Sequence, residues 1–359
     1  MTGIYLHIPF CRTRCPYCDF VSNAISGPVP DAFVEAVCRE INEFAGPEMA
    51  NTVFMGGGTP SLLGPGMLER ILAAVCSRFV LDGPEITIEA NPDDVTPELV
   101  DAWLSMGVNR ISLGVQSFDE RVLRYLGRRH DADGARRASV AVSERCANWG
   151  MDLIFGAPPI DAWEATLDAC LSYAPKHVST YGLTYEPETP FGARRGEGID
   201  DETWLELYRR AEARLAAYDH YEISNYALPG YACRHNLIYW RNLEYAGFGP
   251  AAYSFLGGVR SRNRVPLDEY LAAPGAKSET VHLADREIRV ETVIQHLRLR
   301  VGLSRKSYFD RFGCDVREDF GAALDRLIGR GLVEEDAATF RPTRSGCELN
   351  NEMGLALVD

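Results

Sequence analysis

The chain has 359 residues, of which 46% are hydrophobic, and it carries a formal net charge of −14 at pH 7. This length and apolar content suffice for a large folded domain followed by a smaller one, while the acidity disfavours binding to nucleic acid or to an anionic membrane. We find no run of about 18 apolar residues that could span a membrane and expect no secretory signal, so the protein is predicted to be cytoplasmic with reduced cysteines.

Short β-rich runs alternate with segments whose apolar residues recur at helical spacing. Such alternation indicates βαβ units around a parallel sheet. Six units fit an α/β fold with a partial (β/α)6 barrel, in which ligand-binding residues are expected where strands end. The expected strands are Ile4–Ile8, Thr52–Met55, Glu85–Glu89, Arg110–Val115, Asp152–Phe155, Val178–Leu183 and, as an optional seventh, Tyr221–Ser224. The clearest expected helices are Ala32–Phe44, Met67–Phe79, Pro97–Met106 and Trp204–Tyr218.

Three sections are expected along the chain: the barrel over residues 1–227, an aromatic-rich irregular connection over 228–285, and a small α+β winged-helix-like domain over 286–359. Domains of the last kind often bind DNA. This one is rich in acidic side chains, which suits a phosphate backbone poorly. Its expected elements are the helices Glu287–Arg300, Arg305–Phe312 and Phe320–Arg330, followed by the strand-like run Thr339–Thr343.

Three cysteines, Cys11, Cys15 and Cys18, stand on one short loop after the first expected strand. Iron–sulfur clusters are normally held by four thiolates, so three would leave one iron open to a small molecule. A structural zinc site would need a fourth Cys or His at matching spacing, and the next cysteine, Cys38, stands alone in an expected helix. On these residues alone, zinc or a disulfide remains the alternative.

The spacing Cys-x3-Cys-x2-Cys resembles that of the radical S-adenosylmethionine (SAM) superfamily. The flanking residues are similar to the group that contains the oxygen-independent coproporphyrinogen III oxidases and the HemW heme chaperones. This resemblance implies a [4Fe–4S] cluster whose open iron chelates SAM, and reductive cleavage of SAM to a 5′-deoxyadenosyl radical. The matching flanks are Tyr5-x-His7-Ile8-Pro9-Phe10 and Tyr17-Cys18-Asp19-Phe20.

The same resemblance assigns SAM contacts to polar residues near the ends of the expected strands. A glycine run permits close backbone approach, carboxylates can accept from an ammonium or from ribose hydroxyls, and an arginine can pair with a carboxylate. Each residue alone would more often be a surface residue or a helix cap, but several at matching places favour a site. The predicted contacts are Gly57, Gly58, Thr59, Glu89, Gln116, Arg128 (expected in a helix) and Asp152 (expected to open a strand), with Tyr5 and Tyr17 bordering the pocket; some could serve a second SAM molecule.

Two departures disfavour coproporphyrinogen III oxidase activity. The oxidases carry a further cysteine two positions after the third, where this chain has Phe20, and they have a long extension before the cluster, whereas ten residues precede Cys11 here. The pattern His-Asn-x-x-Tyr-Trp, which begins at His235, is instead similar to a signature of the HemW branch that is associated with heme binding.

His235 is the predicted axial heme ligand, because imidazole commonly ligates heme iron, and Cys233 is a weaker candidate. The alternative is a histidine that hydrogen-bonds inside a packed aromatic junction between the barrel and the tail. A further departure is Tyr253, which stands where HemW-like sequences usually carry a histidine. If that histidine helps to hold heme or SAM, binding here would be weaker or would use the phenolate.

The first hypothesis is therefore a heme chaperone that holds a [4Fe–4S] cluster, SAM and heme. It would pass heme to an acceptor protein and draw electrons from a reducing donor protein. The second is a radical SAM enzyme, such as a methyltransferase or an oxidase-like enzyme, acting on a small aromatic or tetrapyrrole substrate. A third is an acidic winged-helix regulator with a vestigial barrel, which would bind DNA and hold no cluster.

Overall fold

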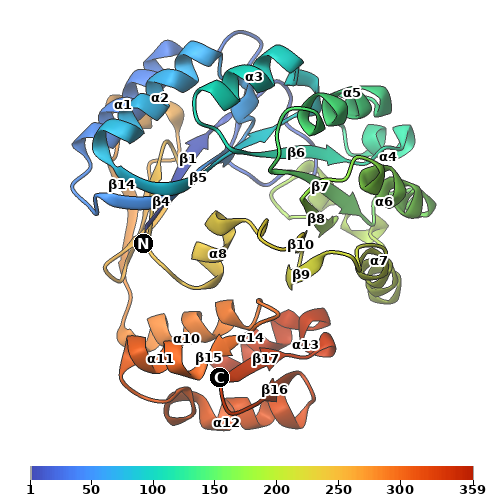
Figure 1. Ribbon diagram of the computed structural model, residues 1–359, viewed down its shortest axis with the longest axis vertical. Coiled ribbons are helices and arrows are strands. Elements are labelled where there is room, and N and C mark those ends of the chain that lie inside the picture. The colour runs from blue at the N-terminus through green and yellow to red at the C-terminus, as the bar shows by residue number, and fades with distance from the viewer. Residues whose placement is uncertain (1, 359) are drawn as a thin grey trace.

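The computed structural model describes residues 2–358, and its main feature is an open barrel of six neighbouring parallel strands (Figure 1). The predicted partial (β/α)6 fold is confirmed, and each of the first six expected strands falls on one strand of the barrel. These strands are β1 (Thr2–Ile8), β4 (Met49–Gly57), β5 (Val80–Ala90), β6 (Arg110–Gln116), β7 (Trp149–Phe155) and β8 (His177–Gly182). The outer helices are α1 (Asp31–Glu43), α2 (Pro65–Arg78), α3 (Pro97–Ser105), α4 (Glu120–Tyr125), α5 (Ala132–Ser143), α6 (Trp163–Ser172) and α7 (Asp201–Arg214).

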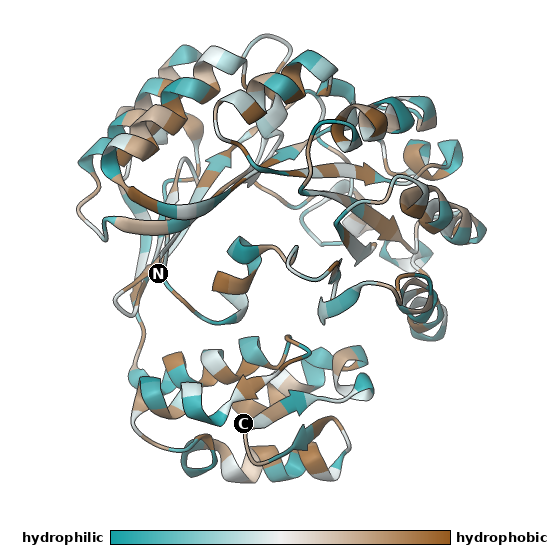
Figure 2. Cartoon of the chain, viewed as in Figure 1, coloured by the Kyte–Doolittle hydropathy of each residue, from teal (hydrophilic) through white to brown (hydrophobic). Residues whose placement is uncertain are grey.

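The barrel strands bury apolar side chains against the helices and turn polar ones inward. On β6, Ile111, Leu113 and Val115 are fully buried on the helix side. The residues that alternate with them, Arg110, Ser112, Gly114 and Gln116, line an internal cavity. Parallel strands covered on both faces are usually apolar throughout, so a polar inner face indicates a ligand site and not a packed core. In Figure 2 the outer surfaces of the helices carry much of the hydrophilic colour.

The optional seventh strand, Tyr221–Ser224, is wrong as a further parallel strand. The chain forms two short strands there, β9 (Asp219–Glu222) and β10 (Asn225–Ala227), which pair with each other antiparallel. β10 also runs antiparallel to β8. Only a tight turn joins β9 to β10, and a parallel pairing would require a crossover connection.

Residues 228–285, expected to be irregular, contain four strands of the same sheet and two short helices. β11 pairs parallel with β1, and three further strands extend the sheet antiparallel from it. Gly257 and Gly258 both have positive φ and form the turn between two of these strands, which is the Gly-Gly hairpin signal that the sequence analysis overlooked. The elements are α8 (Arg234–Trp240), β11 (Tyr245–Phe248), β12 (Tyr253–Leu256), β13 (Val259–Asn263), α9 (Leu267–Ala272) and β14 (Lys277–His282).

The C-terminal domain has its own core, built around Val293, Tyr308, Leu324 and Phe340. It lies across the open side of the barrel, with α8 between them (Figure 1). The three expected helices and the expected strand at Thr339–Thr343 are present, and two more helices follow them. The elements are α10 (Asp285–His296), β15 (Leu303–Ser304), α11 (Arg305–Phe312), α12 (Val316–Gly329), β16 (Val333–Glu335), β17 (Thr339–Pro342), α13 (Arg344–Glu348) and α14 (Asn350–Val358). Within residues 2–358, none of the helices combines the length and the hydrophobicity needed to traverse a lipid bilayer.

Candidate functional site

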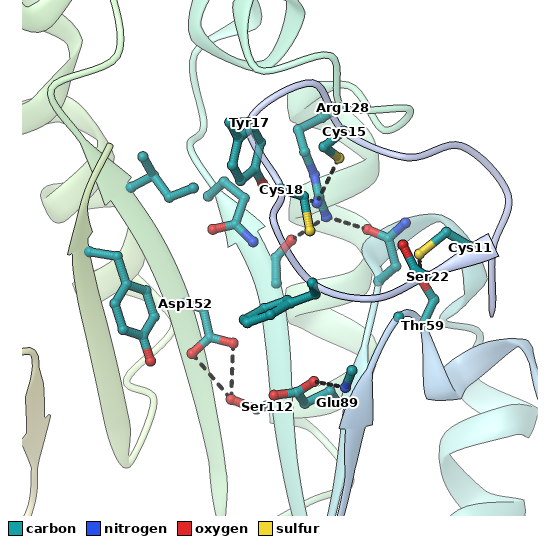
Figure 3. A pocket seen from close by; sticks show the side chains of 18 of the residues that line it. Cys11, Cys15, Tyr17, Cys18, Ser22, Thr59, Glu89, Ser112, Arg128 and Asp152 are labelled. Carbon is teal, nitrogen blue, oxygen red and sulfur yellow. Dashed lines mark hydrogen bonds between the residues drawn. The ribbon is translucent and has the colours of Figure 1, made fainter. Parts of the chain in front are cut away.

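The three cysteines lie on a loop at the carboxyl end of β1. Two short strands, β2 (Phe10–Cys11) and β3 (Asn23–Ala24), pair and close the base of this loop. Inside it, the amide of Cys18 donates to the carbonyl of Cys15 at 3.1 Å. The cysteines all line one cavity of about 450 Å³, a volume within the range of small-molecule sites. Figure 3 shows them above Glu89, Ser112 and Asp152.

His7 connects the barrel to this loop. Its Nε2 lies 2.8 Å from the carbonyl oxygen of Val21, and the hydroxyl of Tyr5 lies 2.9 Å from its Nδ1. Burial lowers the pKa of His7, so the neutral ring donates from Nε2 and accepts at Nδ1. The sequence showed His7 within a motif, but no role was predicted for it.

Tyr5, predicted to border the pocket, lies one layer behind the cavity wall. Its ring lies beside those of Phe54 and His235, with both centroid separations 6.4 Å, and these two rings stack on each other at 5.1 Å. Phe54 lines the cavity and Tyr5 does not. Tyr17, the other aromatic residue predicted at the border, does line it.

The glycine run after β4 packs directly against the cysteine loop. The amide of Gly58 donates to the carbonyl of Ile8 at 2.8 Å, and a Cβ at Gly58 would lie 2.6 Å from the carbonyl oxygen of Phe10. Gly57 adopts a φ of +104°, and its amide donates to Oε2 of Glu89 at 3.3 Å. The hydroxyl of Thr59 donates to Sγ of Cys11 at 3.4 Å. These residues therefore hold the loop in place as well as facing the cavity.

Arg128 had been expected in a helix, but it lies in the turn after α4. Gly127, with a φ of +65°, follows the end of α4 and turns the chain, which is a common way for helices to terminate. The Arg128 guanidinium donates to Sγ of Cys15 at 3.5 Å, to Oδ1 of Asn91 at 2.5 Å and to the carbonyl of Gly114 at 3.0 Å. It places a positive charge beside a cysteine that would bind iron as the thiolate.

Two carboxylates face the cavity from neighbouring parts of the barrel. Burial, and then the charge of Asp152, raise the pKa of Glu89 to about 8. Burial also raises the pKa of Asp152, although the Ser112 hydroxyl donates to it at 3.1 Å. Asp152 sits mid-strand, because β7 already begins at Trp149. Gln116 ends β6 as expected, with a φ of +67°.

The helix α8, which we call the plug helix, contains His235 and lies near the amino ends of the barrel strands, beside Gly3 and Glu85. The His235 ring is 1% exposed; its Nδ1 lies 2.8 Å from the Thr52 hydroxyl and its Nε2 2.9 Å from the Tyr239 hydroxyl. Burial, followed by the charge of Arg110, lowers the pKa of His235 to about 3. Both ring nitrogens therefore have hydrogen-bond partners inside the protein. This agrees with the alternative of a histidine that hydrogen-bonds inside a packed aromatic junction. Heme ligation by His235 stays a prediction, one that requires the plug helix to open.

All ten cysteines are free thiols. Among residues 2–358, no three His, Cys, Asp or Glu side chains are grouped closely enough to hold a single metal ion. Two buried polar atoms in the cavity wall, Ser22 Oγ and Arg128 Nε, have no hydrogen-bond partner. A ligand beside the cysteines would satisfy them.

Comparison with known proteins agrees with this geometry. The radical SAM superfamily profile matches residues 5–170, and the HemN C-terminal domain profile matches residues 283–349. The heme chaperone HemW of Lactococcus lactis is 34% identical over 97% of this chain and 95% of its own length. The chain belongs to the HemW family. The Bacillus subtilis HemW is 32% identical over 98% of both chains.

A solved structure shows that this HemW family member shares its fold with an oxidase. Coproporphyrinogen III oxidase (HemN) from Escherichia coli superposes with a TM-score of 0.86 at 21% identity, covering 99% of this chain and 89% of that one. Membership of the radical SAM superfamily implies a [4Fe–4S] cluster and SAM, and the three cysteines are the residues that fit the cluster. Asn91, Ser112 and Phe54 also line the cavity but were not predicted, although Asn91 and Ser112 stand in the same strand-end segments as Glu89 and Gln116.

Gly58→Ala is expected to displace the cysteine loop, because the new Cβ would lie 2.6–2.8 Å from backbone atoms of Ile8 and Phe10. We expect the iron and sulfide bound after anaerobic reconstitution to fall to less than about half of the wild-type content, with a loss of about 1–3 kcal/mol in stability. Gly66→Ala is the matched control, since no atom lies within 4 Å of its Cβ position. Equal iron content in the two variants would contradict this account of Gly58.

Glu89→Gln is expected to stabilise the cofactor-free protein increasingly as pH rises. The pKa of Glu89 is raised from 4.5 to about 8 on folding, so its stability contribution is fully present below about pH 4.5 and is lost towards pH 8. The unfolding free energies of variant and wild type should be nearly equal below about pH 4.5. Above about pH 8 the variant should be more stable by roughly a few kcal/mol. Glu69→Gln, on the exposed face of α2, is the control. A pH-independent difference would show that Glu89 is not buried as described.

Proposed function

We propose that this protein is a heme chaperone, which binds heme, holds a [4Fe–4S] cluster with SAM, and passes the heme to an acceptor protein. The observation that carries this proposal is the similarity, over nearly the whole chain, to proteins named heme chaperone HemW. A cytoplasmic location and dependence on a reducing electron-donor protein are parts of the same proposal.

The cavity residues would each support the cluster and SAM in a defined way. Cys11, Cys15 and Cys18 would hold three irons, and when bound, the cluster would supply the electron that cleaves SAM. Thr59 and Arg128 donate to two of the sulfurs, which favours their thiolate forms. Glu89 and Asp152 would accept from the ammonium or ribose hydroxyls of SAM, together with Gln116 and the backbone of Gly57.

Phe20 supports a role other than that of the oxidases. It stands where they carry a further cysteine, and it is 60% exposed beside the cavity. An exposed aromatic side chain at the mouth of a cavity suits contact with a flat apolar macrocycle. Tyr253, the other departure, is 39% exposed on β12 with the Arg262 guanidinium 5.0 Å from its ring centroid, so its phenol could reach a ligand from the surface.

A radical SAM enzyme acting on a small aromatic or tetrapyrrole substrate is the second candidate function. One observation favours it: the cavity continues beyond the predicted SAM contacts to His177, Ser179 and Tyr181 on β8. A substrate could occupy this additional volume.

Hemin titration of the anaerobically reconstituted protein tests the proposed function. We expect a shifted, saturable Soret band at about one hemin per chain, and transfer of the bound heme to an apo-hemoprotein in a second step. The same hemin titration of the triple variant Cys11→Ala, Cys15→Ala, Cys18→Ala shows whether heme binding requires the cluster. An unchanged free-hemin spectrum, together with substrate-dependent consumption of SAM, would favour the enzyme.

His235→Ala distinguishes a structural plug from a heme ligand. Removing the ring leaves the Thr52 and Tyr239 hydroxyls unpaired in a buried site, so we expect a loss of about 2–4 kcal/mol in unfolding free energy. If His235 also ligates heme, the Soret band at saturating hemin should change; if it serves only the plug, the band should be unaltered. His282→Ala, on the exposed strand β14, is the control for both measurements.

A further inference from the structure

A buried arginine in the cavity wall has one unpaired donor among the residues that the structure describes. Arg110 begins β6, lines the cavity and is only 1% exposed. Its Nε has no hydrogen-bond partner, and the nearby groups Glu85 and Asp152 act on it through charge. Because a buried donor without an acceptor is costly, the unpaired Nε indicates that a ligand with an acceptor belongs beside it.

His177 is a second unpaired donor in the same wall. It begins β8, is 1% exposed, and its Nε2 lies 2.9 Å from the Tyr221 hydroxyl, while its Nδ1 has no partner. Burial and the charge of Arg110 lower the pKa of His177 well below its usual value, so the ring is neutral. When Tyr221 donates to Nε2, Nδ1 carries the proton and can donate to a ligand.

The strand between these two residues lets the His177 ring lie close to it. Gly150, on β7, pairs in register with His177, and a Cβ at Gly150 would lie 3.2 Å from Nδ1 of that histidine, so a larger residue there would crowd the ring that lines the cavity. Asn236, from the plug helix, lines the same cavity. Three donor-bearing side chains from three elements therefore face one space.

This space lies at the opposite end of β6 from Gln116, one of the predicted SAM contacts. Arg110 and Gln116 are the first and last residues of β6, which separates them by about 20 Å at roughly 3.3 Å per residue. Asp152 lies between the two ends, since Ser112 donates to it and its charge acts on Arg110. Arg110, His177 and Asn236 are not among the predicted SAM contacts, so a SAM molecule held at the carboxyl end leaves their donors unused.

We propose that Arg110, His177 and Asn236 form a carboxylate subsite, so that the cavity takes a carboxylate-bearing ligand in addition to SAM. A planar guanidinium can bind a carboxylate through two parallel hydrogen bonds, and the imidazole and amide N–H groups supply further donors. The carboxylate comes either from a propionate group of heme, a case that rests on the proposed function, or from a small organic acid, a case that does not.

The full-length protein and three variants test this subsite. In the first experiment, Soret titrations compare hemin with its dimethyl ester, in which both propionates are masked. In the second, the thermal unfolding temperature is measured with about 50 mM propionate and with propionamide at matched ionic strength. We expect the wild type to prefer hemin over the ester about tenfold, or to unfold about 2 °C higher with propionate than with propionamide. Arg110→Met should abolish the effect, Arg110→Lys should retain part of it, and Arg300→Met, outside the cavity, should leave it unchanged.

The outcomes separate this subsite from the proposed function. An Arg110-dependent preference for hemin identifies a heme propionate, whereas an Arg110-dependent effect of propionate alone identifies a small acid, even if hemin does not bind. Equal binding of hemin and ester without any effect of propionate overturns the subsite and leaves heme carriage standing. If Arg110→Met does not fold, the wild-type comparisons and Arg110→Lys decide the question.

Discussion

The structure depends on the strict alternation of side chains along its parallel strands. Each barrel strand turns one row of apolar side chains into the helix layer, as Ile111, Leu113 and Val115 do on β6. Burial on that face supplies the hydrophobic stabilisation, so the inner face is free to carry polar groups. The cavity can therefore hold glutamate, aspartate and arginine side chains whose burial would be unfavourable in an ordinary packed core.

A polar interior needs closure at both ends, and two different segments provide it. At the carboxyl end, the cysteine loop is held by His7 and by close contact with Gly58. At the other end, the plug helix is fixed by Glu85, whose carboxylate accepts from the amides of Arg234 and His235 at 3.2 and 3.1 Å. A carboxylate at a helix N-terminus satisfies free amides and complements the helix dipole. The motif that begins at His235 thus contributes Asn236 to the cavity wall.

The plug helix also couples the cavity to the C-terminal domain. The Arg298 guanidinium lies 4.3 Å from the Trp240 ring centroid, and the Asn242 side chain donates to the Thr292 hydroxyl at 3.0 Å. Arg298 in turn pairs with the buried Glu222 at 3.3 Å. Movement of the C-terminal domain would therefore act on the helix that carries His235 and Asn236. This coupling links the position of that domain to one wall of the cavity.

The amino-acid sequence by itself determined the barrel and the cysteine loop, because both can be recognised from patterns of neighbouring residues. Short β-rich runs, helical spacing and the Cys-x3-Cys-x2-Cys motif are each contained within a short stretch of sequence. The pairing of β11 with β1 and of β10 with β8 escaped prediction, because these short strands depend on partners that are distant in sequence. The turn at Gly257 and Gly258 is a local signal that was overlooked. Only the tertiary structure decided that His235 is sealed between Thr52 and Tyr239, that Tyr5 lies behind Phe54, and that Arg110 and His177 face one space. Those relations arise from strands and helices far apart in the chain, and no local pattern encodes which groups they leave without a partner.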